Sequence, residues 1–406
     1  MKLMTRISTA LLAFVACIVH PITARAAEPG DIEPAVLPLI GGDTDFGLGI
    51  GFLGAVSKLD DPITAYRWKL QFTAITTFQY KDSKFKSPYQ DYLLKFTKLN
   101  FLGDNGRIDV LGNFTHSMLY YPGLGNASVT APDPSFDRYE RSSIVLQAVA
   151  RLPLGRSKVL FNESSMGFTH NEASYAPNSR IALDRLSADP VIRGGANLPT
   201  SSGVPLFTQA LVFDSRDSEV ATETGMWHRV AIRAAPGAGG TSYFATPYAG
   251  VDAYLRGYHR IVHERLIFAW RVIADALVGD PATYELGRHE TGWALGGNDG
   301  LRGVPSQRYY GAVKGMATAE MRFWIFGFRL AGTRMRLGGA VFGDAGRVFA
   351  TTKGRTDLDG TGAGIKYGLG GGPRLSQGRQ FEARVDVAYS PDAKPVGIYV
   401  GAGQAF

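Results

Sequence analysis

Hydrophobic and polar residues alternate along much of the chain. In "RWKLQFTAITTFQY" (residues 67–80), the even positions from Trp68 to Tyr80 are mostly aromatic or aliphatic, whereas the odd positions begin with Arg67, Lys69 and Gln71. Because successive side chains of a strand point to opposite faces, this period of two predicts a strand with one apolar and one charged face. Fourteen residues at about 3.3 Å each are long for a globular strand and match a tilted strand that crosses a bilayer.

The same alternation recurs in residues 106–114, 265–275, 316–325 and 380–389. A β-sandwich also alternates, but its polar faces need no full charges and its strands are shorter. A transmembrane barrel turns its apolar face to lipid and its charged face to a wet lumen. The pattern therefore predicts an all-β fold, a single transmembrane antiparallel β-barrel over residues 36–406.

Short turn sequences alternate with longer irregular stretches at residues 120–137, 171–204 and 279–307. Short turns on one rim and long loops on the other are typical of outer-membrane barrels. Fifteen strands are recognisable, and closure of an antiparallel sheet requires an even number, so we predict 16. The remaining strand is expected either before Phe46 or within residues 171–204.

The N-terminus carries basic residues, an apolar run at residues 7–19 and Ala24-Arg25-Ala26. This order predicts a secretory signal peptide over residues 1–26; a lipoprotein signal at Cys17 is the alternative. Cleavage after Ala26 removes the single cysteine, which excludes disulfides. It also removes Lys2, Arg6 and Arg25 and lowers the net charge from +7 to +4. With no basic block, nucleic-acid binding is not expected.

One arginine stands in the glycine-rich stretch "LGGNDGLRGVPSQRYYG" (residues 295–311). "GLRGV" resembles the [V/I/L]-R-G-[F/Y] motif in the sixth loop of the bacterial surface antigen superfamily, the barrels of BamA, TamA and the two-partner-secretion translocases. Val304 replaces the usual aromatic residue. Three further motifs follow the family's order: D-x-R-D with Asp214, Arg216 and Asp217, Glu320 in "TAEMRF", and F-x-D-x-G with Phe342, Asp344 and Gly346.

The resemblance implies that the loop folds back into the barrel and that Arg302 pairs with Glu320 and Asp344. The alternation agrees, since both carboxylates fall on polar faces of their strands. A guanidinium has five donors and can satisfy two carboxylates. Gly303 would let the loop tip approach the wall, and Gly338 is expected to leave room for it.

The chain ends in "PVGIYVGAGQAF". Tyr399, Gly401 and Phe406 resemble the last-strand signal by which barrel-assembly machinery recognises its clients, although Gln404 departs from it. This resemblance predicts that the chain ends on a strand.

The resemblance implies an outer-membrane barrel of a Gram-negative bacterium, a short member without POTRA domains, that inserts or translocates protein or lipid. Its expected partners are outer-membrane lipid, the barrel-assembly machinery and a periplasmic protein. A passive or gated solute or ion channel is the alternative. Glycines at 47, 49, 51 and 54, assigned to the first strand, suggest a weak seam, although glycine is common throughout the chain, with 50 residues.

We expect no enzymatic activity, catalytic residue, metal site or cofactor. The histidines form no recognisable catalytic arrangement, and "HRIVH" (residues 259–263) lacks a third ligand. "GIGFLG" falls within an expected strand without a following helix, so it is not expected to bind a dinucleotide.

Overall fold

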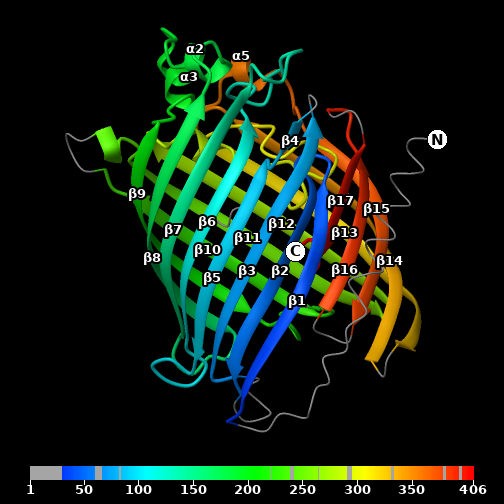
Figure 1. The fold of residues 1–406 in the computed structure, drawn as a ribbon. Helices are drawn as coiled ribbons and strands as arrows, with labels where there is room; N and C mark the ends of the chain where they lie inside the picture. Colours follow the sequence, from blue (N-terminus) through cyan, green and yellow to red (C-terminus); the bar gives the residue numbers. More distant parts are fainter. Residues whose placement is uncertain are drawn as a thin grey trace.

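The computed structural model describes residues 30–59, 66–81, 84–219, 221–237, 242–263, 265–289, 295–330, 333–377, 381–392 and 396–406. Sixteen antiparallel strands close into a barrel, which confirms the predicted fold class and strand number (Figure 1). The predicted signal peptide lies outside the described residues. A short strand, β4 (Lys84–Lys86), only extends the hairpin of β3.

The wall strands are β1 (Ile32–Asp43), β2 (Gly47–Lys58), β3 (Trp68–Lys81), β5 (Tyr89–Leu99), β6 (Arg107–Tyr120), β7 (Arg138–Pro153), β8 (Leu160–Tyr175), β9 (Ser201–Asp214), β10 (Gly225–Ala235), β11 (Tyr248–Val262), β12 (Leu266–Gly279), β13 (Val313–Leu330), β14 (Thr333–Phe349), β15 (Lys366–Gln377), β16 (Phe381–Tyr389) and β17 (Gly397–Ala402).

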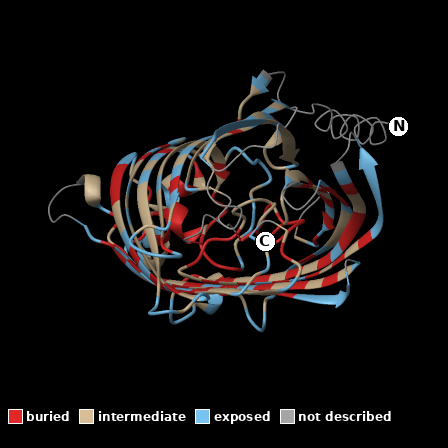
Figure 2. Cartoon of the chain, turned by 90° about the horizontal axis from the view of Figure 1, so that it is seen from below, coloured by how far each residue is buried: buried red, intermediate tan, exposed pale blue. Residues whose placement is uncertain are grey.

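The two faces of the wall differ as the alternation predicts. On β12, Arg271, Ile273 and Asp275 are buried, whereas Val272 and Val278 on the opposite face are exposed. Seen along the barrel, loop segments, several of them buried, cross the space inside the ring of strands (Figure 2). The charged faces therefore line the interior, and the apolar faces form the outer surface that a bilayer would cover.

The long connections gather at one rim. Four short helices belong to them: α2 (Arg180–Asp184), α3 (Pro190–Gly195), α4 (Thr283–Leu286) and α5 (Thr356–Asp359), together with the 3-10 helix η1 (Ser242–Phe244). Helices α2, α3 and α5 lie above the upper rim of the barrel in Figure 1. None of the described helices has the length and apolar character needed to span a membrane.

The strand that the sequence left unplaced is β1, before Phe46. The other candidate region, residues 171–204, contains only the end of β8, α2, α3 and the start of β9. The barrel sheet thus begins at Ile32 rather than Val36. The glycines at 47, 49, 51 and 54 lie in β2 and not in the first strand, so the seam glycines of the first strand are Gly41 and Gly42.

The seam between β1 and β17 is short. Only Gly42 with Val400 and Asp43 with Tyr399 are paired, and the backbone N–H of Thr44 donates to the carbonyl of Ile398 at 3.1 Å. β17 has six residues and β1 has twelve. The residues of β1 from Ile32 to Gly41 therefore have no strand partner on the β17 side among the described residues.

The chain does not end on a strand, contrary to the prediction. β17 ends at Ala402, and Gly403 takes a φ of +83°, which turns the last residues away from the wall. Phe406 is buried inside the barrel, with its ring 4.9 Å from the guanidinium of Arg271 and 5.0 Å from that of Arg322. These inward-facing cations attract the ring, and a Gly at the turn permits the change of direction.

Candidate functional site

The described parts of the connection between β12 and β13, residues 280–289 and 295–312, enter the barrel, and the second part turns sharply at its tip. The backbone N–H of Gly297 donates to the carbonyl of Val304 at 2.7 Å, and that of Val304 donates to Leu301 at 3.2 Å. Gly297 and Gly303 have φ values of +83° and +91°, a region in which other residues are strained. The turn places Arg302 at the tip of the loop.

The loop is seated by apolar packing on both sides of its tip. Leu295, Leu301 and Val304 are fully buried. They form one cluster with inward-facing side chains of the wall: Tyr254, Ile273, Met316 and Val348. A Cβ on Gly346, one of the predicted motif residues, would lie 2.9 Å from Leu295 and 3.0 Å from Leu301. Glycine at this position thus leaves the space in which the loop leucines pack.

The guanidinium of Arg302 is buried among three carboxylates. Its Nε donates to Oδ2 of Asp344 at 2.9 Å and its Nη2 to Oδ1 at 3.1 Å. Its Nη1 donates to Glu320 at 3.0 Å and to Asp386 at 3.3 Å. The backbone N–H of Arg302 also donates to Asp344 at 3.1 Å. The structure therefore brings Arg302, Glu320 and Asp344 together and adds Asp386 from β16.

Phe342 forms the floor of this site. Its ring centroid lies 3.2 Å from Cζ of Arg302, and its side chain faces inward on β14, two residues before Asp344. A guanidinium stacked on an aromatic face is attracted to the ring, more strongly where water is excluded. Asp344 thus binds the edge of the guanidinium of Arg302, and the ring of Phe342 packs against its face.

The carboxylates around Arg302 have further cationic partners. Arg322 Nε donates to Glu320 at 2.8 Å. Arg384 Nη1 donates to Asp386 at 2.6 Å, and Nη1 of Arg374 forms an ion pair with Asp386 at 2.7 Å. A fourth carboxylate, Glu382, is buried on the same face of β16 as Asp386. The cluster thus contains four arginines and four acids: Arg302, Arg322, Arg374, Arg384, Glu320, Asp344, Glu382 and Asp386.

Buried charges are costly unless they are paired and hydrogen-bonded. Here four arginines face four acids, so the formal charges balance, and removal of any one member leaves the buried cluster with a net charge. The arrangement is therefore suited to holding the loop in one position rather than to binding a free ion. Within the described ranges, no three His, Cys, Asp or Glu side chains are grouped so that they would hold a metal ion.

The loop also contacts β17 and the turn after β1, which the sequence did not indicate. The backbone N–H of Gly303 donates to Oη of Tyr399 on β17 at 2.9 Å. The backbone N–H of Ser306 donates to Oδ2 of Asp45, in the turn after β1, at 2.7 Å. Tyr399, predicted only as part of an assembly signal, therefore also contacts the motif glycine.

A glycine of the wall leaves room for the loop tip, but this glycine is Gly368 and not the predicted Gly338. A Cβ on Gly338 would meet Phe323 and Trp324, not the loop. A Cβ on Gly368, on β15, would overlap the carbonyl oxygen of Arg302. The loop tip meets Gly368 because this glycine is the register partner of Asp344, whereas Gly338 lies nearer the turn between β13 and β14.

The D-x-R-D motif lies at the opposite rim from the long loops. Arg216 Nε and Nη2 donate to Asp214 at 2.9 and 2.8 Å. The carboxylate of Asp217 accepts from the backbone N–H groups of Glu223 and Thr224 at 3.0 and 3.2 Å. The motif thus closes the turn between β9 and β10 and is separate from the Arg302 cluster. Gly401 is the register partner of Arg384 on β16, and a Cβ there would meet no atom within 4 Å.

Three solved barrels have a similar fold. BamA from Haemophilus ducreyi lacking POTRA domains 1–3 gives a TM-score of 0.57 at 12% identity, covering 91% of this chain and 70% of that one. CdiB from Escherichia coli gives 0.56 at 10%, covering 94% and 64%. CdiB from Acinetobacter baumannii gives 0.54 at 11%, covering 93% and 60%.

This chain thus spans 60–70% of the length of these three structures. No protein-family model and no curated protein matches it. The likeness to solved structures concerns the fold, and it confirms the barrel fold that the resemblance implied. The chain has the 16-strand barrel fold of BamA and CdiB, with a loop held in the lumen by a buried arginine.

Proposed function

We propose that this barrel inserts or translocates protein or lipid at the outer membrane of a Gram-negative bacterium. The observation that carries the proposal is the loop seated inside a closed barrel by Arg302, next to a seam paired at two positions. A barrel for free diffusion requires an open lumen, whereas here the loop tip and its apolar cluster are buried within it. A short seam is the part of the wall that separates with the loss of fewest hydrogen bonds.

The expected partners follow from this role. Outer-membrane lipid covers the apolar outer face, and barrel-assembly machinery is required for insertion of the barrel itself. A periplasmic partner would deliver the client at the rim that carries Asp214, Arg216 and Asp217. We propose a transport role rather than catalysis, because the buried charges described above are engaged with one another.

A gated ion channel is the second candidate, supported by one observation. At the rim of short turns a cavity of about 250 Å³ is lined by Arg107, Arg151, Arg216 and Arg256 together with Asp109, Glu163 and Glu219. Charged groups at the mouth of a pore select ions. This channel would conduct only if the loop left the lumen.

The insertase proposal is tested by the folding of a urea-denatured client barrel into liposomes that contain the purified protein. We expect the client to fold faster than in empty liposomes. The variant Ile40→Cys/Ala402→Cys extends the seam register by two positions, and its disulfide would hold the seam closed.

Oxidation of this variant is expected to abolish the acceleration, and reduction to restore it. Gln71→Cys/Lys95→Cys, which joins the fully paired strands β3 and β5, is the matched control and should be insensitive to oxidation. Equal client folding with the seam oxidised or reduced would exclude lateral opening. No acceleration by the wild type would favour the channel.

A further inference from the structure

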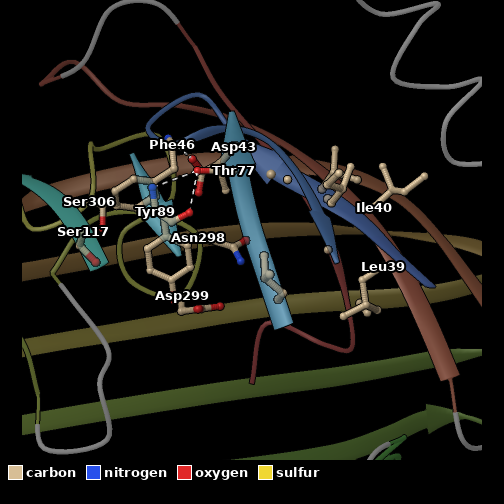
Figure 3. Close-up of a pocket in the computed structure, with 18 of the residues that line it drawn as sticks. Leu39, Ile40, Asp43, Phe46, Thr77, Tyr89, Ser117, Asn298, Asp299 and Ser306 are labelled. Atoms are coloured by element: carbon tan, nitrogen blue, oxygen red, sulfur yellow. Dashed lines mark hydrogen bonds between the residues drawn. The ribbon is translucent and has the colours of Figure 1, made fainter. Parts of the chain in front are cut away.

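A cavity of about 570 Å³ lies between the seam and the inward loop (Figure 3). It is lined by residues of β1, β2 and β3, by the loop around Asn298 and Asp299, and by Val400 to Ala402 of β17. Its size falls within the range of small-molecule sites in proteins, about 300–1,000 Å³. The Arg302 cluster does not line it.

The inner wall at this cavity is apolar, unlike the wall around Arg302. Register pairs place Leu39, Leu53 and Ile75 on the inward face, because they alternate with the outward-facing Ile50 and Phe52. Gly41 and Gly49 lie on the same inward face and add no side chains. An apolar surface that faces a wet lumen is unfavourable unless an apolar group covers it.

The cavity adjoins the part of the wall that is least closed. Ile40, whose side chain faces outward, lines it together with the inward-facing Leu39. The residues of β1 up to Gly41 have no partner on the β17 side, so the adjacent wall is an unpaired edge. A chain-like apolar ligand can therefore enter from the side of the bilayer without breaking the two seam pairs.

One end of the cavity is acidic. Asp43, Asn298 and Asp299 lie on one side in Figure 3, and Leu39 and Ile40 on the other. The lining contains the carboxylates of Asp43 and Asp299 and no Lys, Arg or His. One oxygen of Asp299 lies 3.4 Å from Nη2 of Arg384, behind the lining. Such an end favours a head group that carries a positive charge and donates hydrogen bonds.

We propose that this seam cavity binds one acyl chain of a membrane lipid whose head group bears an ammonium, with the chain against Leu39, Leu53 and Ile75 and the ammonium near Asp43 and Asp299. The inference rests on the proposed position of the barrel in a membrane. It does not require that the protein insert clients. The bound chain covers the apolar inner wall and fills the space that glycine leaves.

The test uses full-length protein in lipid nanodiscs with phosphatidylethanolamine that carries a diazirine in its acyl chain. After irradiation, peptide mass spectrometry locates the labelled residues. We expect label on the inward-facing Leu53 and Ile75 in addition to the outward-facing Phe52. Diazirine-bearing phosphatidylglycerol should label the inward residues at least fivefold less, because its head group is anionic.

Gly401→Leu fills the cavity without strain, since Gly401 lines it and a Cβ there meets nothing within 4 Å. We expect it to reduce inward labelling at least fivefold and to leave labelling of Phe52 unchanged. Gly112→Leu, on the outward face of β6, is the matched control, because its Cβ meets only Leu146 at 3.6 Å. Heat-modifiable electrophoretic mobility verifies that both variants fold.

Label confined to outward residues in the wild type, or inward label unchanged in Gly401→Leu, would overturn the proposal. Equal labelling of Leu53 and Ile75 by the two lipids would show that the cavity does not select a head group with an ammonium, and would overturn that part of the proposal. Client folding into liposomes is measured separately on the same preparations. Loss of insertase activity with inward labelling retained would reject the proposed function and keep the lipid site.

Discussion

Arg302 is fully buried, and its charge is balanced only by residues on three strands far apart in the sequence. Glu320, Asp344 and Asp386 come from β13, β14 and β16, so the arginine ties the loop at one point to a stretch of wall four strands wide. A lysine at this position carries the charge but lacks the planar fork that reaches several carboxylates at once.

Arg302→Ala is expected to destabilise the barrel by about 3–5 kcal/mol, because it leaves buried carboxylates without their partner. The measurement is the temperature at which heat-modifiable mobility is lost, compared with Arg302→Lys, which should be intermediate. Asp344→Ala should have a similar effect. The double variant should be no worse than either single one, since the pair acts as a unit; fully additive losses would contradict the pairing.

Asp45, in the turn after β1, is a pH-sensitive contact of the loop. Burial, together with the negative charge of the nearby Asp43, raises the pKa of Asp45 to about 7. The hydrogen bond from the backbone N–H of Ser306 lowers the pKa by less than these two effects raise it. Between the ordinary value of 3.8 and about 7, the folded state binds a proton that the unfolded state has lost. Stability must therefore fall as pH rises through this window and stay reduced above it.

We expect the unfolding temperature of the wild type to be higher at pH 5 than at pH 8. Asp45→Asn removes the titrating group and keeps an oxygen acceptor for Ser306. It should therefore flatten the difference between these two pH values. A variant with the same pH dependence as the wild type would exclude Asp45 as its source.

At the scale of the elements, the close approach of the loop to β15 depends on glycine. A Cβ at position 368 would overlap the carbonyl oxygen of Arg302, and overpacking of this kind costs about 1–3 kcal/mol. Gly368→Ala should lower the unfolding temperature and increase cleavage of the loop by added protease. Gly112→Ala, whose Cβ makes only an ordinary contact with Leu146 on the outward face, should change neither. Equal protease sensitivity of both variants would contradict this seating of the loop.

The strands were predictable wherever one face is charged and the other apolar, as in β3, β12 and β16. β1 was not, because "IEPAVLPLIGGD" contains Pro34 and Pro38 and lacks polar alternation. Proline in a strand is confined to edges and bulges, which fits the position of β1 at the seam. The alternation also indicates which face Asp386 occupies, but not that β16 lies close enough to Arg302 to share its charge.

The inward turn of the C-terminal residues could not be predicted from their own sequence. "YVGAGQAF" resembles a final strand, and the turn at Gly403 depends on Arg271 and Arg322, which come from β12 and β13. Likewise, the sequence does not show that the loop tip meets Gly368 and not Gly338. This position depends on the register of β14 and β15 in the closed barrel.

At the scale of the whole molecule, the interior is divided into two parts. The wall from β12 to β16 carries the charged cluster that fixes the loop, whereas β1, β2 and β3 present Leu39, Leu53 and Ile75 to the seam cavity. The loop lies between them and contacts Tyr399 on β17 and Asp45 in the turn after β1. The loop position and the state of the seam are therefore mechanically connected.

The central claim is that Arg302 holds the loop in the lumen and so closes the barrel. Its most direct test is the planar-bilayer current through the wild type and Arg302→Ala, with Arg193→Ala in helix α3 of an outer loop as the matched control. We expect a closed or briefly flickering wild type, an unchanged control, and larger, longer openings in Arg302→Ala. A stable, wide, ion-selective pore in the wild type that ignores the loss of Arg302 would contradict the account.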